Sequence, residues 1–148
     1  MEHTIGYVLD TNVLVALIRG NDLGKTIDHR FRLRGHLRRC MISVVTVGEM
    51  YSLARKFGWG EKKREALQAL LNELVWIDIS HPEVLECYGE IDCDSQKMGR
   101  AMTKNDVWIA ATARAAGATL LTTDADFDHL HGHYITRIHI DPRAALDE

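Results

Sequence analysis

Four acidic residues stand where their carboxylates could act together, namely Asp10, Glu49, Asp106 and Asp124. Asp10 and Asp124 each follow a short apolar run, Asp106 lies at the start of an alanine-rich segment, and Glu49 lies about one turn into another segment. Clustered carboxylates raise one another's pKa, and a hard divalent cation removes that cost. Oxygen donors without a matching Cys and His set favour Mg²⁺ or Mn²⁺ over Zn²⁺. The chemistry expected of such a site is metal-assisted phosphodiester hydrolysis.

Each of the four residues also has an ordinary structural explanation. Asp10 and Asp106 fit helix N-caps, Glu49 fits a first turn favoured by the helix dipole, and Asp124 fits a turn. Taken singly, each residue leaves both interpretations open, and their joint placement is what favours a shared site.

Five short apolar segments predict strands, at residues 5–9, 41–45, 75–79, 119–122 and 135–140. Helical patterns lie between them, with Thr46 as a cap for the helix of Glu49 and Pro82 in the first turn of a helix that breaks near Cys93. Such alternation predicts an α/β fold with a mainly parallel sheet and helices on both faces. Reactive groups in these sheets collect beyond the carboxyl ends of the strands, where the acidic residues fall.

The chain has 148 residues, enough for one domain with a sizeable core, and we expect a single domain over 1–148. The net charge of −3 argues against nucleic-acid binding through overall charge, so such binding needs a local basic patch or bound cations. Three cysteines without a C-x-x-C pair predict a reducing, cytoplasmic location. No run is apolar and long enough for a membrane span, and no signal peptide is expected.

One candidate basic patch is the segment 29–39, HRFRLRGHLRR, which has five arginines and no acidic residue. Because arginine suits phosphate, one hypothesis is an RNA-binding patch near the acidic cleft, formed by Arg30, Arg32, Arg34, Arg38 and Arg39. The alternative is a solvated helix face that binds nothing.

Two further patterns have mainly structural interpretations. His129, His131 and His133 alternate like metal ligands, but their spacing departs from closed zinc sites, so a surface loop is favoured. The apolar residues from Met50 to Trp59 and the stripe at 67–74 predict core. Any part of them left on the surface would favour a homodimer or a groove for a partner helix.

Three stretches of the sequence resemble PIN-domain ribonucleases of the VapC toxin type: YVLDTNVLVALI at 7–18, ISVVTVGEMYSLA at 42–54 and NDVWIAATARAAGATLLTTDADF at 105–127. Their order and spacing extend the resemblance over nearly the whole chain. The resemblance implies a three-layer α/β/α fold and an endoribonuclease that depends on Mg²⁺ or Mn²⁺. It also implies a role as the toxin of a toxin–antitoxin pair, with a cognate antitoxin as partner.

The resemblance further implies roles for individual residues. Asp10, Glu49, Asp106 and Asp124 become the catalytic and metal-binding quartet, Asn12 and Thr122 support it, and Asp126 is a helper. In-line attack of water on the phosphorus would then expel the 3′ oxygen and leave a 5′-phosphate and a 3′-hydroxyl. No motif encodes the RNA sequence that is cleaved.

Three alternatives stay open at this point. A PIN-type nuclease could serve in RNA processing or DNA flap cleavage, and a neighbouring gene for a small DNA-binding protein would favour the toxin instead. A receiver domain or aspartyl-phosphate phosphatase also has a strand that ends in Asp, but the Asp10–Asn12 stretch lacks the second Asp those proteins need. A non-catalytic nucleic-acid-binding module is the third, and the intact quartet argues against it.

Overall fold

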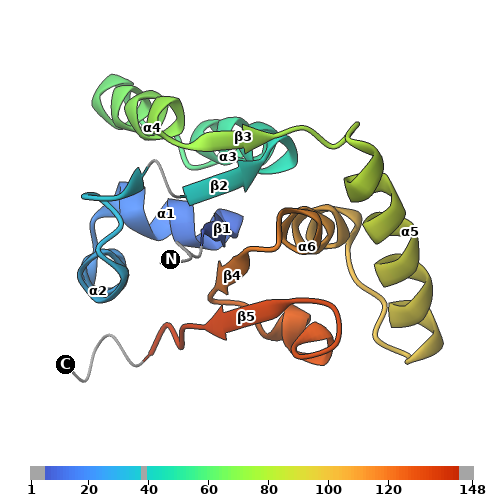
Figure 1. The fold of residues 1–148 in the computed structure, drawn as a ribbon. Helices are drawn as coiled ribbons and strands as arrows, with labels where there is room; N and C mark the ends of the chain where they lie inside the picture. The colour runs from blue at the N-terminus through green and yellow to red at the C-terminus, as the bar shows by residue number, and fades with distance from the viewer. Residues whose placement is uncertain (1–5, 38–39, 144–148) are drawn as a thin grey trace, which may run out of the picture.

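The computed structural model describes residues 6–37 and 40–143, and five parallel strands form its central sheet. The strands lie in the order β3-β2-β1-β4-β5 (Figure 1), with bounds β1 (Tyr7–Leu9), β2 (Cys40–Ser43), β3 (Val75–Ile77), β4 (Thr119–Thr122) and β5 (Thr136–His139). The central strand β1 pairs with β4 so that Leu9 lies opposite Leu121. The prediction of a mainly parallel sheet is confirmed.

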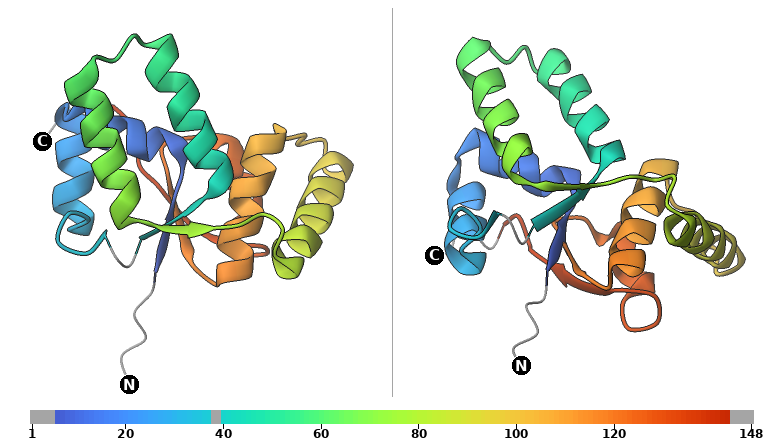
Figure 2. Two further views of the ribbon diagram at one scale, coloured as in Figure 1. Left: turned by 90° about the horizontal axis from the view of Figure 1, so that it is seen from above. Right: turned by 45° about the horizontal axis from the view of Figure 1, so that its top comes forward.

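Helices cover both faces of this sheet, as Figure 2 shows in two views. One hydrophobic cluster joins the sheet to α1 (Thr11–Arg19), α2 (Asp22–Phe31), α3 (Val44–Lys56) and α4 (Glu61–Glu73), and a second joins it to α5 (Pro82–Lys97) and α6 (Lys104–Ala116). Successive strand residues point to opposite faces, so Leu9 belongs to the first cluster and Val8 to the second. This is the expected three-layer α/β/α fold.

The start of α3 differs from the prediction. The strand was expected to continue to residue 45 with Thr46 as the cap, whereas β2 ends at Ser43, whose hydroxyl accepts a 3.1 Å hydrogen bond from the Val45 N–H. The cap begins the helix three residues earlier than expected and overrides the strand preference of the β-branched pair Val44 and Val45. Thr46 therefore lies inside α3, where it is fully buried.

The predicted break in α5 near Cys93 is wrong. The helix runs without interruption to Lys97, and the chain leaves it through Gly99, whose φ of 70° is in the left-handed region that glycine adopts without strain. No proline or glycine lies between residues 90 and 97 to end the helix earlier.

The helix α2 was not predicted as a separate element. It packs so closely on α1 that a Cβ at Gly24 would lie 2.1 Å from the carbonyl oxygen of Ala16, which only glycine avoids. Asn21 caps α2 by accepting a 2.9 Å hydrogen bond from the Gly24 N–H. The two helices form a hairpin that returns the chain to the amino-terminal ends of the strands, where β2 begins.

Most of the predicted apolar core is buried. Met50 and Leu71 are fully buried and Trp59 is 6% exposed, whereas Phe57 keeps 45% of its surface exposed.

Within the described residues, no helix combines the length and the apolar character that crossing a membrane requires.

Candidate active site

Asp10 lies at the centre of the candidate site because it follows the central strand. Its backbone N–H donates to the carbonyl oxygen of Leu121 in β4 at 3.0 Å, and its Oδ1 accepts from the Thr11 N–H at 2.8 Å. Its Oδ2 accepts from the hydroxyl of Thr122 at 2.7 Å. Asp10 is therefore the cap of α1 and also a carboxylate, 3% exposed, held at the carboxyl edge of the sheet.

A second group of carboxylates comes from the start of α6 and from the segment after β4. Oxygens of Asp106, Asp124 and Asp126 all lie within 4.8 Å of one another. Thr103 caps α6 by accepting a 3.2 Å hydrogen bond from the Asp106 N–H, so the cap explanation for Asp106 is wrong. Asp124 does have the expected turn role, since its Oδ1 accepts from the Asp126 N–H at 2.9 Å and caps the 3-10 helix η2 (Ala125–Leu130).

Glu49 reaches the site from α3. Its Oε1 accepts a 3.0 Å hydrogen bond from the hydroxyl of Thr11, and that hydroxyl also lies 3.2 Å from the hydroxyl of Thr46. The charge of Glu49 contributes to raising the pKa of Asp10, so the two carboxylates are near enough to interact. Thr11 thereby contacts both of them, one through its N–H and the other through its hydroxyl.

Burial and mutual repulsion make these carboxyl groups hard to ionise. Burial raises the pKa of Asp10 to about 6 against two hydrogen bonds that lower it. Burial, followed by the charge of Asp10, raises the pKa of Asp106 to about 7. Desolvation and the charge of Asp124 raise the pKa of Asp126 above its ordinary value. In the described part of the chain, no ion pair involves any of these carboxylates.

Such a set of donors fits a hard divalent cation. The group of Asp106, Asp124 and Asp126 contains oxygen donors and no His or Cys, and the charge of Asp10 acts on Asp106 from beside it. Because Mg²⁺ and Mn²⁺ prefer carboxylate oxygens, a bound cation of this kind would replace repulsion among the carboxylates by attraction.

Comparison with known proteins identifies the family. The family model described as the PIN domain matches residues 7–132. The chain belongs to the PIN domain family. This PIN domain is 28% identical over 118 residues to ribonuclease VapC2 of Haemophilus influenzae, covering 80% of this chain and 86% of that protein. It is 30% identical to ribonuclease VapC1 of another strain, covering 78% and 84%.

A solved structure shares the whole fold with this PIN domain. The crystal structure of VapBC2 from Rickettsia felis, bound to a DNA fragment from its promoter, is similar with a TM-score of 0.75 and 25% identity. The similarity covers 91% of this chain and 98% of that chain. The solved structure therefore matches this PIN domain along nearly its full length.

The predicted supporting residues of the PIN domain occupy different positions. Thr122 contacts Asp10, and its hydroxyl also accepts a 2.9 Å hydrogen bond from the Asp124 N–H. Asp126 belongs to the same group, within 4.8 Å, as Asp106 and Asp124, which places it with the candidate ligands. Asn12 is exposed on α1, and within the described ranges no hydrogen bond involves its side chain, so the geometry gives it no orienting role.

Three threonines in this site were missed. Each had a signal in the sequence: Thr11 directly follows Asp10, Thr46 is three residues before Glu49 and so shares its helix face, and Thr103 is three residues before Asp106 as in a capping box. These spacings are common in proteins, so only the contacts reveal their use.

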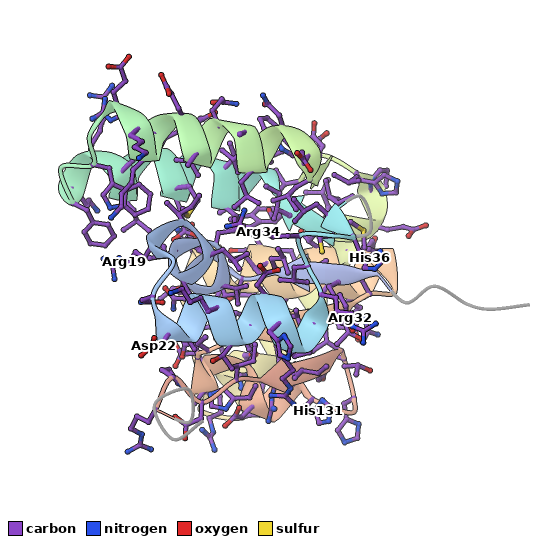
Figure 3. All side chains as sticks on the ribbon, turned by 90° about the vertical axis from the view of Figure 1, so that its left-hand side faces the viewer. Arg19, Asp22, Arg32, Arg34, His36 and His131 are labelled. Atoms are coloured by element: carbon purple, nitrogen blue, oxygen red, sulfur yellow. The ribbon has the colours of Figure 1, made fainter. Side chains whose placement is uncertain are left out.

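The described part of the arginine run lies at the opposite edge of the sheet from the carboxylates. Phe31 at the end of α2 packs edge-on against Tyr7, the first residue of β1, with ring centroids 5.8 Å apart. Figure 3 shows Arg32 and His36 near this end of α2. Because Asp10 follows the other end of β1, the prediction that the run borders the acidic cleft is wrong for this part.

The arginines of this run also differ in their surroundings. Arg30 and Arg32 are exposed, and Arg32 ends α2 with a φ of 53°. Arg34 forms a 3.3 Å ion pair with Asp28 and donates to the carbonyl oxygen of Leu17. Arg38 and Arg39 lie outside the described residues. The alternative interpretation, a solvated helix face, applies only up to Phe31, because α2 ends there and a loop follows.

The three histidines do not converge. His129 Nε2 lies 2.9 Å from the hydroxyl of Ser95 on α5, and His131 Nδ1 accepts a 3.1 Å hydrogen bond from the Arg137 N–H. His133 is exposed in the turn that follows. The first contact fixes η2, which follows Asp124, against α5.

Proposed function

We propose that this PIN domain is an endoribonuclease that depends on a divalent cation and is the toxin of a type II toxin–antitoxin system. The observation that carries the proposal is the convergence of Asp10, Glu49, Asp106, Asp124 and Asp126 at one sheet edge, where none of them forms an ion pair within the described residues. The names of the relatives, ribonucleases VapC1 and VapC2, supply the substrate class.

The chain's own residues hold and orient the reacting groups. Asp106, Asp124 and Asp126 would bind the cation together with Asp10, and Glu49 would complete the acidic set. Thr122 fixes one oxygen of Asp10 and Thr11 fixes the other through its N–H, so the carboxylate cannot rotate freely. The chemistry supplied by a bound Mg²⁺ or Mn²⁺ is polarisation of the phosphodiester and a lower pKa of water. The expected products are a 5′-phosphate and a 3′-hydroxyl.

We expect RNA to contact more of the surface than the carboxylates alone. The exposed face of α2 has a groove lined by Lys25, Asp28, His29, Arg30 and Arg32, and cations of this groove suit phosphates. Since the end of α2 that carries Arg30 and Arg32 lies at the other edge of the sheet, this end of the groove would bind RNA away from the cleaved bond. Arg34, Arg38 and Arg39 stay predicted members of this RNA-binding group. A cytoplasmic location stays part of the proposal, because three cysteines without a C-x-x-C pair favour a reducing compartment.

A cognate antitoxin is the proposed protein partner. The Rickettsia felis structure is named as VapBC2 bound to promoter DNA, and the present PIN domain shares its fold over nearly all of its length. A homodimer is a second prediction, supported by the exposed apolar side chains of Tyr51 on α3 and of Phe57, which caps the end of that helix. Light scattering of the protein, alone and co-expressed with the product of a neighbouring gene, tests both.

The deciding experiment is cleavage of a mixed RNA pool with mapping of the new 5′ ends. We expect 5′-phosphate ends with Mg²⁺ or Mn²⁺, none with EDTA, and none from the Asp124→Asn variant. A DNA flap substrate assayed in parallel addresses the alternative nuclease role. Full cleavage in EDTA would refute the metal dependence, and cleavage of the flap alone would refute the ribonuclease.

A further inference from the structure

Two buried threonines join α1 to α3 beside the carboxylates. Thr11 is 5% exposed and Thr46 is fully buried, and their hydroxyl oxygens lie 3.2 Å apart although 35 residues separate them in the sequence. The Thr11 hydroxyl also lies 3.0 Å from Glu49 Oε1. The three side chains thus form a line that ends at a member of the acidic set.

The direction of the hydrogen bonds in this line follows from the chemistry of the groups. An ionised carboxylate only accepts, so the single proton of the Thr11 hydroxyl is donated to Glu49. The Thr11 oxygen then accepts the proton of Thr46. Thr11 meanwhile donates its N–H to Asp10 Oδ1 at 2.8 Å. One residue therefore donates to two carboxylates from different elements.

Packing alone does not account for the hydroxyl of Thr46. Burying a hydroxyl costs free energy unless it is hydrogen-bonded, and valine fills nearly the same volume without that cost. Within the described residues, Thr11 is the one hydrogen-bond partner of the Thr46 hydroxyl. Other residues of α3, such as Val47 and Met50, are apolar and belong to the hydrophobic cluster that also contains residues of α1, so an apolar side chain would suit this contact as well. The hydroxyl pair thus needs a reason other than filling space.

We propose that Thr46, acting through Thr11, is a positioning residue that sets the place of Glu49 relative to Asp10 for cation binding. The proposal rests on the function proposed above. The Thr46 hydroxyl holds the Thr11 hydroxyl in the orientation in which its proton points at Glu49. Without that hydroxyl, Thr11 is free to turn, and Glu49 loses its fixed distance from Asp10.

The test compares valine and serine variants in the full chain. Titration calorimetry with Mn²⁺ measures binding directly, and the Mn²⁺ dependence of RNA cleavage gives a second readout. Residues that orient metal ligands typically change affinity or activity by about 10- to 100-fold. We therefore expect Thr11→Val to weaken Mn²⁺ binding by about 10-fold or more, Thr46→Val to weaken it less, and Thr11→Ser to restore it. Because the residues act in series, the double valine variant should bind no more weakly than Thr11→Val alone.

A matched control is available on α6. Thr112 is fully buried and donates to the carbonyl oxygen of Trp108 at 2.8 Å, so Thr112→Val makes the same change away from the carboxylates. The melting temperature without metal is measured for every variant, and Thr46→Val decides the matter if Thr11→Val folds poorly. Mn²⁺ affinities of Thr11→Val and Thr46→Val equal to that of Thr112→Val would overturn the proposal.

The proposed function and this inference can fail separately. If the wild type binds Mn²⁺ and cleaves no RNA, the ribonuclease fails while the Mn²⁺ affinities of the valine variants still decide the positioning role. If the wild type cleaves RNA and the valine variants match the control, the positioning role alone fails. If the wild type binds no Mn²⁺ at all, both are overturned.

Discussion

Thr122 donates a 2.7 Å hydrogen bond to Asp10 across 112 residues of sequence. The same hydroxyl oxygen accepts from the Asp124 N–H at 2.9 Å, so one side chain at the end of β4 holds two of the acidic residues in register. The contact exists because β1 and β4 are parallel neighbours that end at the same edge of the sheet. Because the Thr122 hydroxyl contacts two candidate metal ligands, a substitution of this residue tests the site directly.

Replacing Thr122 by valine should impair cleavage without unfolding the protein. The change leaves Asp10 Oδ2 without its donor and the Asp124 N–H without its acceptor, and orienting contacts of this kind are worth about 10- to 100-fold in activity or metal affinity. The unpaired buried groups should also cost about 1–3 kcal/mol of unfolding free energy. Denaturant titration and RNA cleavage measure the two effects. Thr122→Ser keeps the hydroxyl and should stay close to wild type, and wild-type cleavage by the valine variant would contradict the assignment.

Asp106→Asn should remove most of the activity and leave the fold intact. Thr103 provides the cap of α6, so the Asp106 carboxyl is not needed to begin the helix. At neutral pH the amide also removes a charge that burial and Asp10 disfavour, so the metal-free variant should melt at or above the wild-type temperature. Thermal melts in EDTA and a cleavage assay with Mg²⁺ test both parts. A metal-free melting temperature well below that of wild type would assign Asp106 a structural role.

Asp126→Asn should also weaken cation binding, although the family resemblance implies only a helper role for this residue. Its carboxylate lies within the same 4.8 Å group as Asp106 and Asp124. We expect weaker Mn²⁺ binding, measured by calorimetry, and higher Mn²⁺ requirements in the cleavage assay. Asp128→Asn is the neighbouring control, because Asp128 pairs with Arg137 at 3.1 Å outside the group. Equal Mn²⁺ affinities of the two variants would remove Asp126 from the ligands.

The metal-free protein should lose stability as the pH rises from acidic to neutral. Folding raises the pKa of Asp10 from 3.8 to about 6 and that of Asp106 to about 7, so the folded state binds more protons than the unfolded chain between these values. Stability therefore falls as pH increases through this window. Melting temperatures in EDTA should show the fall in wild type and a smaller one in the Asp10→Asn/Asp106→Asn variant, which controls for the histidines. Identical pH profiles would disprove the raised pKa values.

Arginines on α2 should affect RNA affinity and its salt dependence, with little effect on the saturated rate. Each lost phosphate contact should flatten the slope of log K against log salt by about 0.7 for single-stranded RNA. Arg30→Ala and Arg32→Ala remove exposed cations far from the carboxylates, and Lys62→Ala on α4 is a control of the same charge change. Binding isotherms at several salt concentrations measure the slopes. Slopes equal to that of the Lys62 variant would leave the groove on α2 without a role in RNA binding.

The sequence alone determined the layers of the fold and predicted that four carboxylates lie together at the carboxyl ends of the strands. Both are local signals: short apolar runs alternate with helical patterns, and acidic residues stand where strands end. Because consecutive strands in such a chain must be joined by crossovers, the parallel sheet follows, and the ends of its strands meet at one edge. The VapC-like stretches around Asp10, Glu49 and Asp106 pointed to the same fold and site.

The tertiary structure decided what those residues touch. Thr46 looked like a helix cap, and only the earlier cap at Ser43 places it inside α3 against Thr11. The arginine run was expected near the acidic residues, but the close α1–α2 packing at Gly24 brings its described part to the opposite edge of the sheet. Spacing along the chain fixes which residues share a strand or a helix face. Contacts between elements depend on caps and close approaches that single residues control, and these appear only once the chain is folded.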